Sequence, residues 1–202
     1  MPNTISVPGN PALPSGGSNT VRIVSPVTNA GLINLYGIEF QADFQLNSHL
    51  LINSSFALNE TDVKHYETCS DCVQILGTTT ADGHVPNAPK WTAALGVNYT
   101  DHLVDEWRWF SRVDYTYKGK MFIDYTNLAW VQAANRVNVS AGVDNDKLRF
   151  TAFVRNLTKN STPPSVTRIT NGFYNFFPPR QHSINYTLPE KRTFGVAVSY
   201  DF

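Results

Sequence analysis

The two cysteines of the chain, Cys69 and Cys72, are its most reactive side chains, and they stand three positions apart. A pair at this spacing is compatible with a disulfide, a redox pair or half of a metal site. No second such pair and no spaced histidine pair completes a zinc site, and the flanking residues resemble a loop rather than the helix start of a redox motif. A disulfide that stiffens an exposed loop is the leading interpretation, and it fits an oxidising compartment.

Residues 168–182 combine arginines with closely spaced aromatic rings. Exposed aromatic and arginine side chains are frequent anchors of recognition sites, because they offer stacking and cation–π contacts. We predict that this segment binds a ligand; the alternative is that its rings belong to an interfacial girdle or pack the loop on itself. The predicted ligand-binding residues are Arg168, Tyr174, Phe176, Phe177, Arg180 and His182.

No group of side chains predicts catalysis. The sequence has no nucleophile–base pair, no paired catalytic carboxylates and no glycine-rich phosphate loop, so we expect neither an enzyme nor a cofactor. Lys plus Arg equals Asp plus Glu at 16 each. This balance argues against a nucleic-acid partner, because proteins that bind nucleic acids carry a strongly basic surface.

The elements that position these residues are predicted to be strands. Aromatic residues make up 12% of the chain and charged residues 16%, a composition that favours β-structure. No apolar run reaches the roughly 18 residues of a transmembrane helix. From about Gly31 onward, apolar and polar residues alternate with a period of two. The predicted strands lie near residues 36–46, 50–59, 91–100, 107–118, 136–143, 148–155 and 193–202.

The polar face of these strands is predicted to line an aqueous lumen, either as a solvated wall or as a surface that guides an anionic cargo. Exceptions to the alternation are few; Phe110 and Phe153, for example, fall on the polar face. No charged residue stands out from its neighbours. The charged residues assigned to this face are Glu39, Asp43, Arg108, Arg112, Asp114, Arg136, Arg149 and Arg155.

The connections between the predicted strands alternate in length. Short turns on one side and long loops on the other are typical of an outer-membrane β-barrel. Aromatic residues at strand ends, such as Trp91 and Tyr99, fit the interfacial girdles of such a barrel. A secreted β-sandwich also shows alternation and is the alternative fold. The short links lie near residues 47–49, 100–106 and 144–146, and the long ones at about 60–90, 118–134 and 156–191.

Four motifs, in this order, resemble the TonB-dependent outer-membrane receptors. Asn29-Ala30-Gly31 followed by Tyr36-Gly37-Ile38-Glu39 resembles the start of a late barrel strand. Residues 85–92 (VPNAPKWT) are similar to the stretch that leads into a later strand, and residues 155–160 (RNLTKN) to the exit of the penultimate strand. In the latter motif Thr158 departs from the usual Phe-Asp. Residues 192–202 resemble the closing strand with its terminal aromatic residue.

This resemblance, which covers about residues 29–202, implies the C-terminal part of an antiparallel transmembrane β-barrel. Family members have about 22 strands and an N-terminal plug domain. They import a scarce nutrient, commonly a ferric siderophore, across the bacterial outer membrane with energy from the TonB complex. The chain then corresponds to a loop and strand lead-in (1–30) and about the last seven strands (31–202), without the plug.

The expected partners are outer-membrane lipid, a small-molecule cargo such as an iron chelate, and the TonB complex, reached through the missing N-terminal part. Two other functions stay open at this point. One is a passive porin-like or adhesin barrel, and the other is a secreted β-sandwich that serves as a binding module.

Overall fold

The computed structural model describes residues 4–6, 20–22, 31–66, 70–78, 83–170 and 182–202. The chain forms two compact units, Met1–Ala30 and Gly31–Phe202. In the first unit, the short strands β1 (Thr4–Ser6) and β2 (Thr20–Arg22) pair in antiparallel fashion. For this region we expected a loop and a strand lead-in, not a strand pair. Both strands contain a threonine next to a β-branched Ile or Val, and such residues favour extended backbone.

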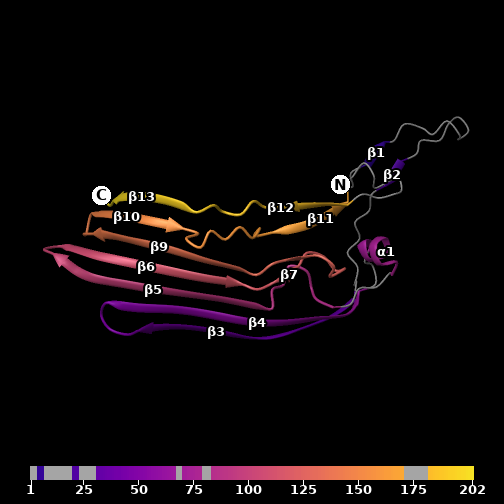
Figure 1. The fold of residues 1–202 in the computed structure, drawn as a ribbon, viewed down its shortest axis with the longest axis horizontal. Helices are drawn as coiled ribbons and strands as arrows, with labels where there is room; N and C mark the ends of the chain where they lie inside the picture. Colours follow the sequence, from indigo (N-terminus) through magenta and orange to yellow (C-terminus); the bar gives the residue numbers. More distant parts are fainter. Residues whose placement is uncertain (1–3, 7–19, 23–30, 67–69, 79–82, 171–181) are drawn as a thin grey trace, which may run out of the picture. The chain divides into compact units, whose positions relative to one another are not determined.

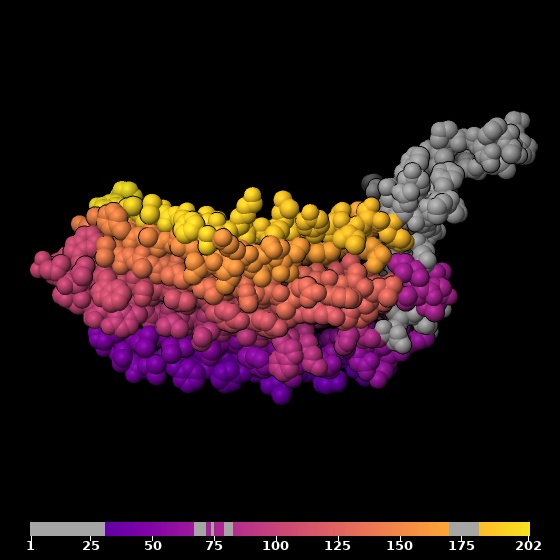
Figure 2. All heavy atoms as spheres, in the orientation of Figure 1, coloured from indigo at the N-terminus to yellow at the C-terminus, as the bar shows by residue number. Residues whose placement is uncertain are grey.

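The second unit is built on one antiparallel sheet of seven strands (Figure 1). Each strand pairs with the next strand of this sheet along the chain, and Figure 2 shows the same succession as bands from indigo to yellow. All seven predicted strands are confirmed. The strands are β3 (Gly31–Gln45), β4 (Leu50–Tyr66), β5 (Trp91–Val104), β6 (Trp107–Lys118), β9 (Ala134–Asp144), β10 (Leu148–Arg155) and β13 (Thr193–Tyr200).

Three tight turns join these strands at the end of the sheet that lies on the left in Figure 1. In two of them an asparagine side chain organises the turn. Asn47 Oδ1 accepts hydrogen bonds from the backbone N–H groups of His49 (2.8 Å) and Leu50 (2.9 Å). Asn145 Oδ1 does the same for Lys147 (3.0 Å) and Leu148 (2.7 Å). These two short polar links therefore act as turns because an Asn side chain replaces a backbone acceptor.

The three long connections leave from the opposite end of the sheet and contain elements that alternation did not predict. Five such elements occur in the described residues. They are α1 (Ser70–Leu76), β7 (Met121–Phe122), β8 (Trp130–Val131), β11 (Val166–Thr170) and β12 (His182–Tyr186). β7 pairs with β8, and β11 pairs with β12. Among the described residues, the largest cluster of buried apolar side chains lies here, formed by Met121, Ile123 and Val131 with Ala129 and Val166.

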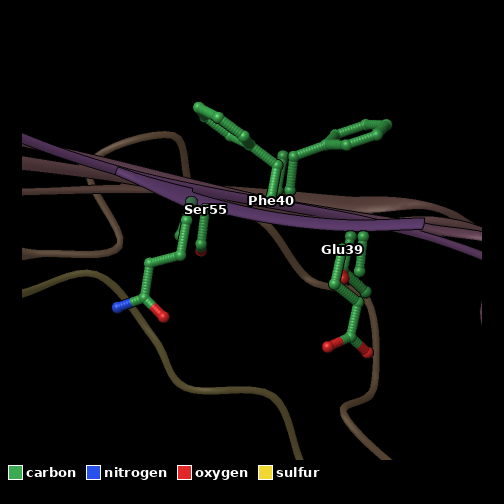
Figure 3. A pocket seen from close by; sticks show the side chains of 9 residues that line it. Glu39, Phe40 and Ser55 are labelled. Atoms are coloured by element: carbon green, nitrogen blue, oxygen red, sulfur yellow. The ribbon is translucent and has the colours of Figure 1, made fainter. Parts of the chain in front are cut away.

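The seven-stranded sheet has one apolar and one polar face. Figure 3 shows Phe40 on one side of the sheet and Glu39 and Ser55 on the other. The hollow drawn there is no enclosed cavity, because its residues come from both faces. Large side chains of the apolar face are exposed, among them Tyr36, Ile38, Phe40, Phe44, Phe56, Trp91, Leu95, Trp109, Val113, Tyr115, Phe150, Phe194, Val196, Val198 and Tyr200.

This uncovered apolar face excludes the β-sandwich for the described residues, since a sandwich buries such a face against a second sheet. A soluble monomer rarely exposes so broad an apolar surface. No helix in the described part of the chain is long and apolar enough to span a membrane. The sheet is not closed: β3 and β13 each have only one neighbouring strand.

Aromatic rings pair at both ends of the apolar face. Near the turns, the rings of Tyr99 and Trp109 lie 4.9 Å apart between their centroids. Toward the long connections, the rings of Phe56 and Trp91 lie 5.3 Å apart. Rings with a polar group prefer the boundary between hydrocarbon and water, so these pairs fit the two edges of an apolar belt.

Phe110 and Phe153, the two rings on the polar face, each lie over a glycine in the neighbouring strand. Phe110 is directly opposite Gly142, and Phe153 is directly opposite Gly195. A Cβ atom at either glycine would overlap the ring. Because glycine has no side chain, each ring has space to lie flat on the sheet. The alternation of apolar and polar residues does not reveal this arrangement.

The two faces of β13 give a direct test of sidedness. Val196 is 82% exposed on the apolar face, and Ala197 lies beside it on the polar face. We expect Val196→Arg to destabilise the barrel in lipid vesicles by about 2–4 kcal/mol, because a charge near the bilayer midplane is poorly solvated. Ala197→Arg, in contact with water, should change the unfolding free energy far less. Equal losses for the two variants in urea titrations of the complete barrel would contradict this register.

Candidate functional site

The polar face carries a chain of hydrogen bonds that crosses four strands, from β3 to β6. Asn53 Nδ2 donates to Asp43 Oδ1 (2.7 Å), and Asn98 Nδ2 donates to Asn53 Oδ1 (2.9 Å). Arg112 Nη1 donates to Asn98 Oδ1 (2.6 Å), while its Nε donates to Asp114 Oδ2 (2.8 Å). The predicted charges Asp43, Arg112 and Asp114 therefore satisfy one another through two asparagines.

A second group of charges lies on this face near the turns. Asp144 is flanked by Arg108, whose Nε lies 3.2 Å from Oδ1, and by Arg149, whose Nη1 lies 3.4 Å from Oδ2. The guanidinium of Arg149 also stacks on the ring of Phe110, 4.0 Å from its centroid. Because both arginines are about half exposed, each pair contributes little to stability. Their effect is to neutralise the wall locally.

Arg168, one of the predicted ligand-binding residues, is committed to an ion pair between two long connections. Its Nε lies 2.6 Å from Oδ2 of Asp124, and the two side chains are only 14% and 10% exposed. Oδ1 of Asp124 accepts hydrogen bonds from the backbone N–H (2.9 Å) and the hydroxyl of Thr126. Arg168 therefore joins β11 to the loop between β7 and β8, and its guanidinium faces Asp124.

The surroundings of Asp124 act on its pKa in opposite directions. Burial alone would raise the pKa of this carboxyl. The hydrogen bonds from Thr126 and Arg168, together with the positive charge of Arg168, outweigh burial and hold the pKa below its usual value. The carboxylate is consequently ionised at neutral pH and stabilises the packed arrangement of the two connections.

Of the remaining predicted ligand-binding residues, only His182 lies in the described part of the chain. His182 opens β12 opposite Thr170, two positions along β11 from Arg168. It is partly buried, and its Nδ1 has no hydrogen-bond partner in the described part of the chain. Strands β11 and β12 thus bring Arg168 and His182 to the two sides of residues 171–181. Tyr174, Phe176, Phe177 and Arg180 lie outside the described residues.

Cys72 lies on α1, is fully buried and is disulfide-bonded. It packs against Tyr66 and Tyr125, whose stacked rings lie 4.3 Å apart. Cys69 lies outside the described residues, so its pairing with Cys72 stays a prediction. The expectation that the flanking residues form a loop is wrong, because a helix begins at Ser70 soon after β4.

Asn156, quoted in a motif but not assigned a role, proves to organise the exit from β10. It adopts a left-handed backbone (φ 50°) and is only 1% exposed. Its Nδ2 donates to the carbonyls of Asn160 (2.9 Å) and Glu190 (2.7 Å), and its Oδ1 accepts from the N–H of Asn160 (2.9 Å). Residues 156–190 are therefore tied at their base, where Asn is favoured because it tolerates positive φ.

An exposed aromatic cluster on the long connections was also missed. The rings of His84 and Phe122 stack at 5.4 Å, and Lys120 Nζ lies 4.8 Å from the ring of Phe122 and 4.3 Å from that of Trp130. These residues come from segments without alternation, in which neither spacing nor period indicates a common surface. The pairing of β7 with β8 and the hydrogen bonds between His84 and Asn127 bring them together.

A model of one known protein family matches more than half of the chain. Residues 3–157 match the family described as TonB dependent receptor-like, beta-barrel. A search of curated protein sequences found no match.

Three solved structures share the fold. The ferric yersiniabactin uptake receptor FyuA from Yersinia pestis aligns with a TM-score of 0.67 at 16% identity, over 86% of this chain and 24% of that one. The ferric preacinetobactin receptor BauA from Acinetobacter baumannii aligns with a TM-score of 0.62 at 18% identity, over 100% and 26%. The siderophore receptor PiuA from the same organism gives 0.60 at 17%, over 83% and 22%. The chain spans about a quarter of each.

The Asp124–Arg168 pair predicts a local response to acid. Because the folded pKa of Asp124 is lowered, its contribution to stability is present above the ordinary value of 3.8 and is lost as pH falls through the folded pKa. We expect hydrogen–deuterium exchange in residues 121–131 and 166–170 to rise as the pH falls below the folded pKa of Asp124. Asp124→Asn should show the fast exchange already at neutral pH, because it leaves the buried Arg168 unpaired. Asp144→Asn, far from these connections, is the control, and faster exchange there too would contradict the assignment.

Proposed function

Because the chain belongs to the TonB-dependent receptor β-barrel family, we propose that it is part of an outer-membrane receptor that imports a ferric siderophore. Members of this family are β-barrel receptors of the bacterial outer membrane and not enzymes. The proposal goes beyond the family in two respects, the ferric siderophore as cargo and transport that uses energy. The TonB complex would supply that energy through other parts of the receptor. The three similar structures are named as siderophore receptors, which supports the choice of cargo.

The observation that carries the proposal is the two-faced single-layer sheet. An uncovered apolar face with aromatic rings near both ends suits lipid, and a hydrogen-bonded charged face suits a wet interior. The free edges of β3 and β13 require further strands, since unpaired backbone groups cost several kcal/mol each in hydrocarbon. We infer that the rest of the receptor supplies those strands and completes the barrel.

The long connections provide the proposed cargo-contacting surface. The connection between β6 and β9 is packed, as its buried residues Met121, Ile123 and Val131 show. Arg168 and His182 frame residues 171–181, and we retain the proposal that Tyr174, Phe176, Phe177 and Arg180 contact the cargo. Since Arg168 is paired with Asp124, its proposed part is to hold the base of this segment rather than to bind cargo directly.

Transport can be tested in iron-starved cells that carry the complete receptor. We expect deletion of its gene to abolish uptake of at least one radiolabelled ferric siderophore, and restoration of the gene to recover it. Loss of TonB should abolish the same uptake, because passage is energised. Uptake that survives without TonB would favour a passive porin-like barrel. Unchanged uptake of every siderophore tested in the deletion strain would contradict the proposal.

A further inference from the structure

A cavity of about 190 Å³ lies where β6 ends and β9 begins, next to the long connections. Thr116, Lys118 and Arg136 line it from the polar face of the sheet. Met121 and Val131 add apolar walls, and Pro163 closes it from the connection that follows β10. Three segments distant in sequence thus enclose one small space at the loop end of the polar face.

Two cationic side chains meet in this cavity. Arg136 is directly opposite Thr116, and Lys118 is the diagonal neighbour of Arg136 on the same face. Diagonal neighbours across antiparallel strands lie about 7–8 Å apart at the backbone, within reach of one bound group. No acidic residue lines the cavity. In the part of the chain that the structure describes, neither Lys118 nor Arg136 makes an ion pair.

The other arginines of the polar face each have an acidic or aromatic partner among the described residues. Arg108 and Arg149 flank Asp144, Arg112 binds Asp114, and the guanidinium of Arg155 stacks 4.9 Å from the centroid of the Phe153 ring. The Nε of Arg136 is buried and has no hydrogen-bond partner among the described residues. A buried charged donor without an acceptor is costly, so the fold holds open a position for an acceptor that the described residues do not supply.

We propose that this cavity binds an anionic oxygen group of the cargo, a carboxylate or a group of similar size and charge. The inference rests on the proposed transport function. Arg136 Nε–H and the Lys118 ammonium donate to the anion, with the Thr116 hydroxyl available beside them. A volume of about 190 Å³ equals roughly six water molecules, enough for one anionic group but not for a whole iron chelate. Apolar walls strengthen the attraction because they keep water away.

The first experiment uses oxalate, a small dicarboxylate, as the probe and therefore needs no knowledge of the cargo. Titration calorimetry on the complete receptor in detergent should show binding that weakens about tenfold or more in Arg136→Gln, because a charge-assisted hydrogen bond is lost. Arg136→Lys keeps the charge but removes the buried Nε–H, so binding should be intermediate. Lys118→Gln should also weaken binding. Arg108→Gln, on the same face but paired with Asp144, should bind like the original protein.

The second experiment asks whether the anion belongs to the cargo. Uptake of an anionic ferric chelate, ferric citrate, is compared with that of an uncharged ferric trihydroxamate in the same variants. We expect Arg136→Gln to reduce uptake or binding of the anionic chelate more than that of the neutral one. An equal effect on both would overturn the assignment of the anion to cargo.

Failure of the inference and failure of the transport function give different results. Absence of oxalate binding, or equal binding by the original receptor and Arg136→Gln, overturns the anion site whatever uptake shows. Oxalate binding through Arg136 without uptake of any ferric chelate leaves the anion site in place but contradicts transport, and with it the link to cargo. Each variant is checked for a folded, heat-stable barrel by its electrophoretic shift. A folded barrel excludes misfolding as the cause of lost binding or uptake.

Discussion

Hydrogen bonding between neighbouring antiparallel strands fixes the register of the seven-stranded sheet, and its two edge strands pair on one side only. Successive side chains must then point to opposite sides, and each strand presents one apolar and one polar row. Because no second layer covers the apolar row in the described residues, it needs a nonaqueous surrounding. The polar row needs water or internal partners, which the chain from Asp43 to Asp114 supplies.

The same constraint explains where the protein keeps its compact packing. A soluble domain buries its apolar residues between the sheet and a second layer. Here the buried residues Met121, Ile123 and Val131 cluster in the long connections instead. The Asp124–Arg168 pair joins two of these connections, and the hydrogen bonds of Asn156 tie the last connection at its base. A packed loop structure can keep a small cavity open between Lys118 and Arg136, whereas loose loops could not.

Local signals in the sequence were sufficient to predict the strands of the sheet. A period of two and Asn-containing turns act within a few residues, so strands and tight turns could be predicted. The pairing of Arg168 with Asp124 joins residues 44 positions apart and depends on loop packing, which has no period. The rings of Phe110 and Phe153 broke the alternation because glycines in the next strand accommodate them, a relation visible only once the register is known. For the same reason Arg136 could not be distinguished from its neighbours.

If the sheet has one lipid side and one water side, neighbouring residues of β6 must lie in different surroundings. Nitroxide labels are placed singly at Val113, Asp114, Tyr115 and Thr116 of the complete receptor in lipid vesicles, with Cys69 and Cys72 replaced by serine. Accessibility to oxygen, which concentrates in hydrocarbon, should be high at Val113 and Tyr115 and low at Asp114 and Thr116. A water-soluble nickel chelate should show the opposite order. Accessibility without alternation, or contact of the nickel chelate with all four positions, would contradict a sheet with one lipid side and one water side.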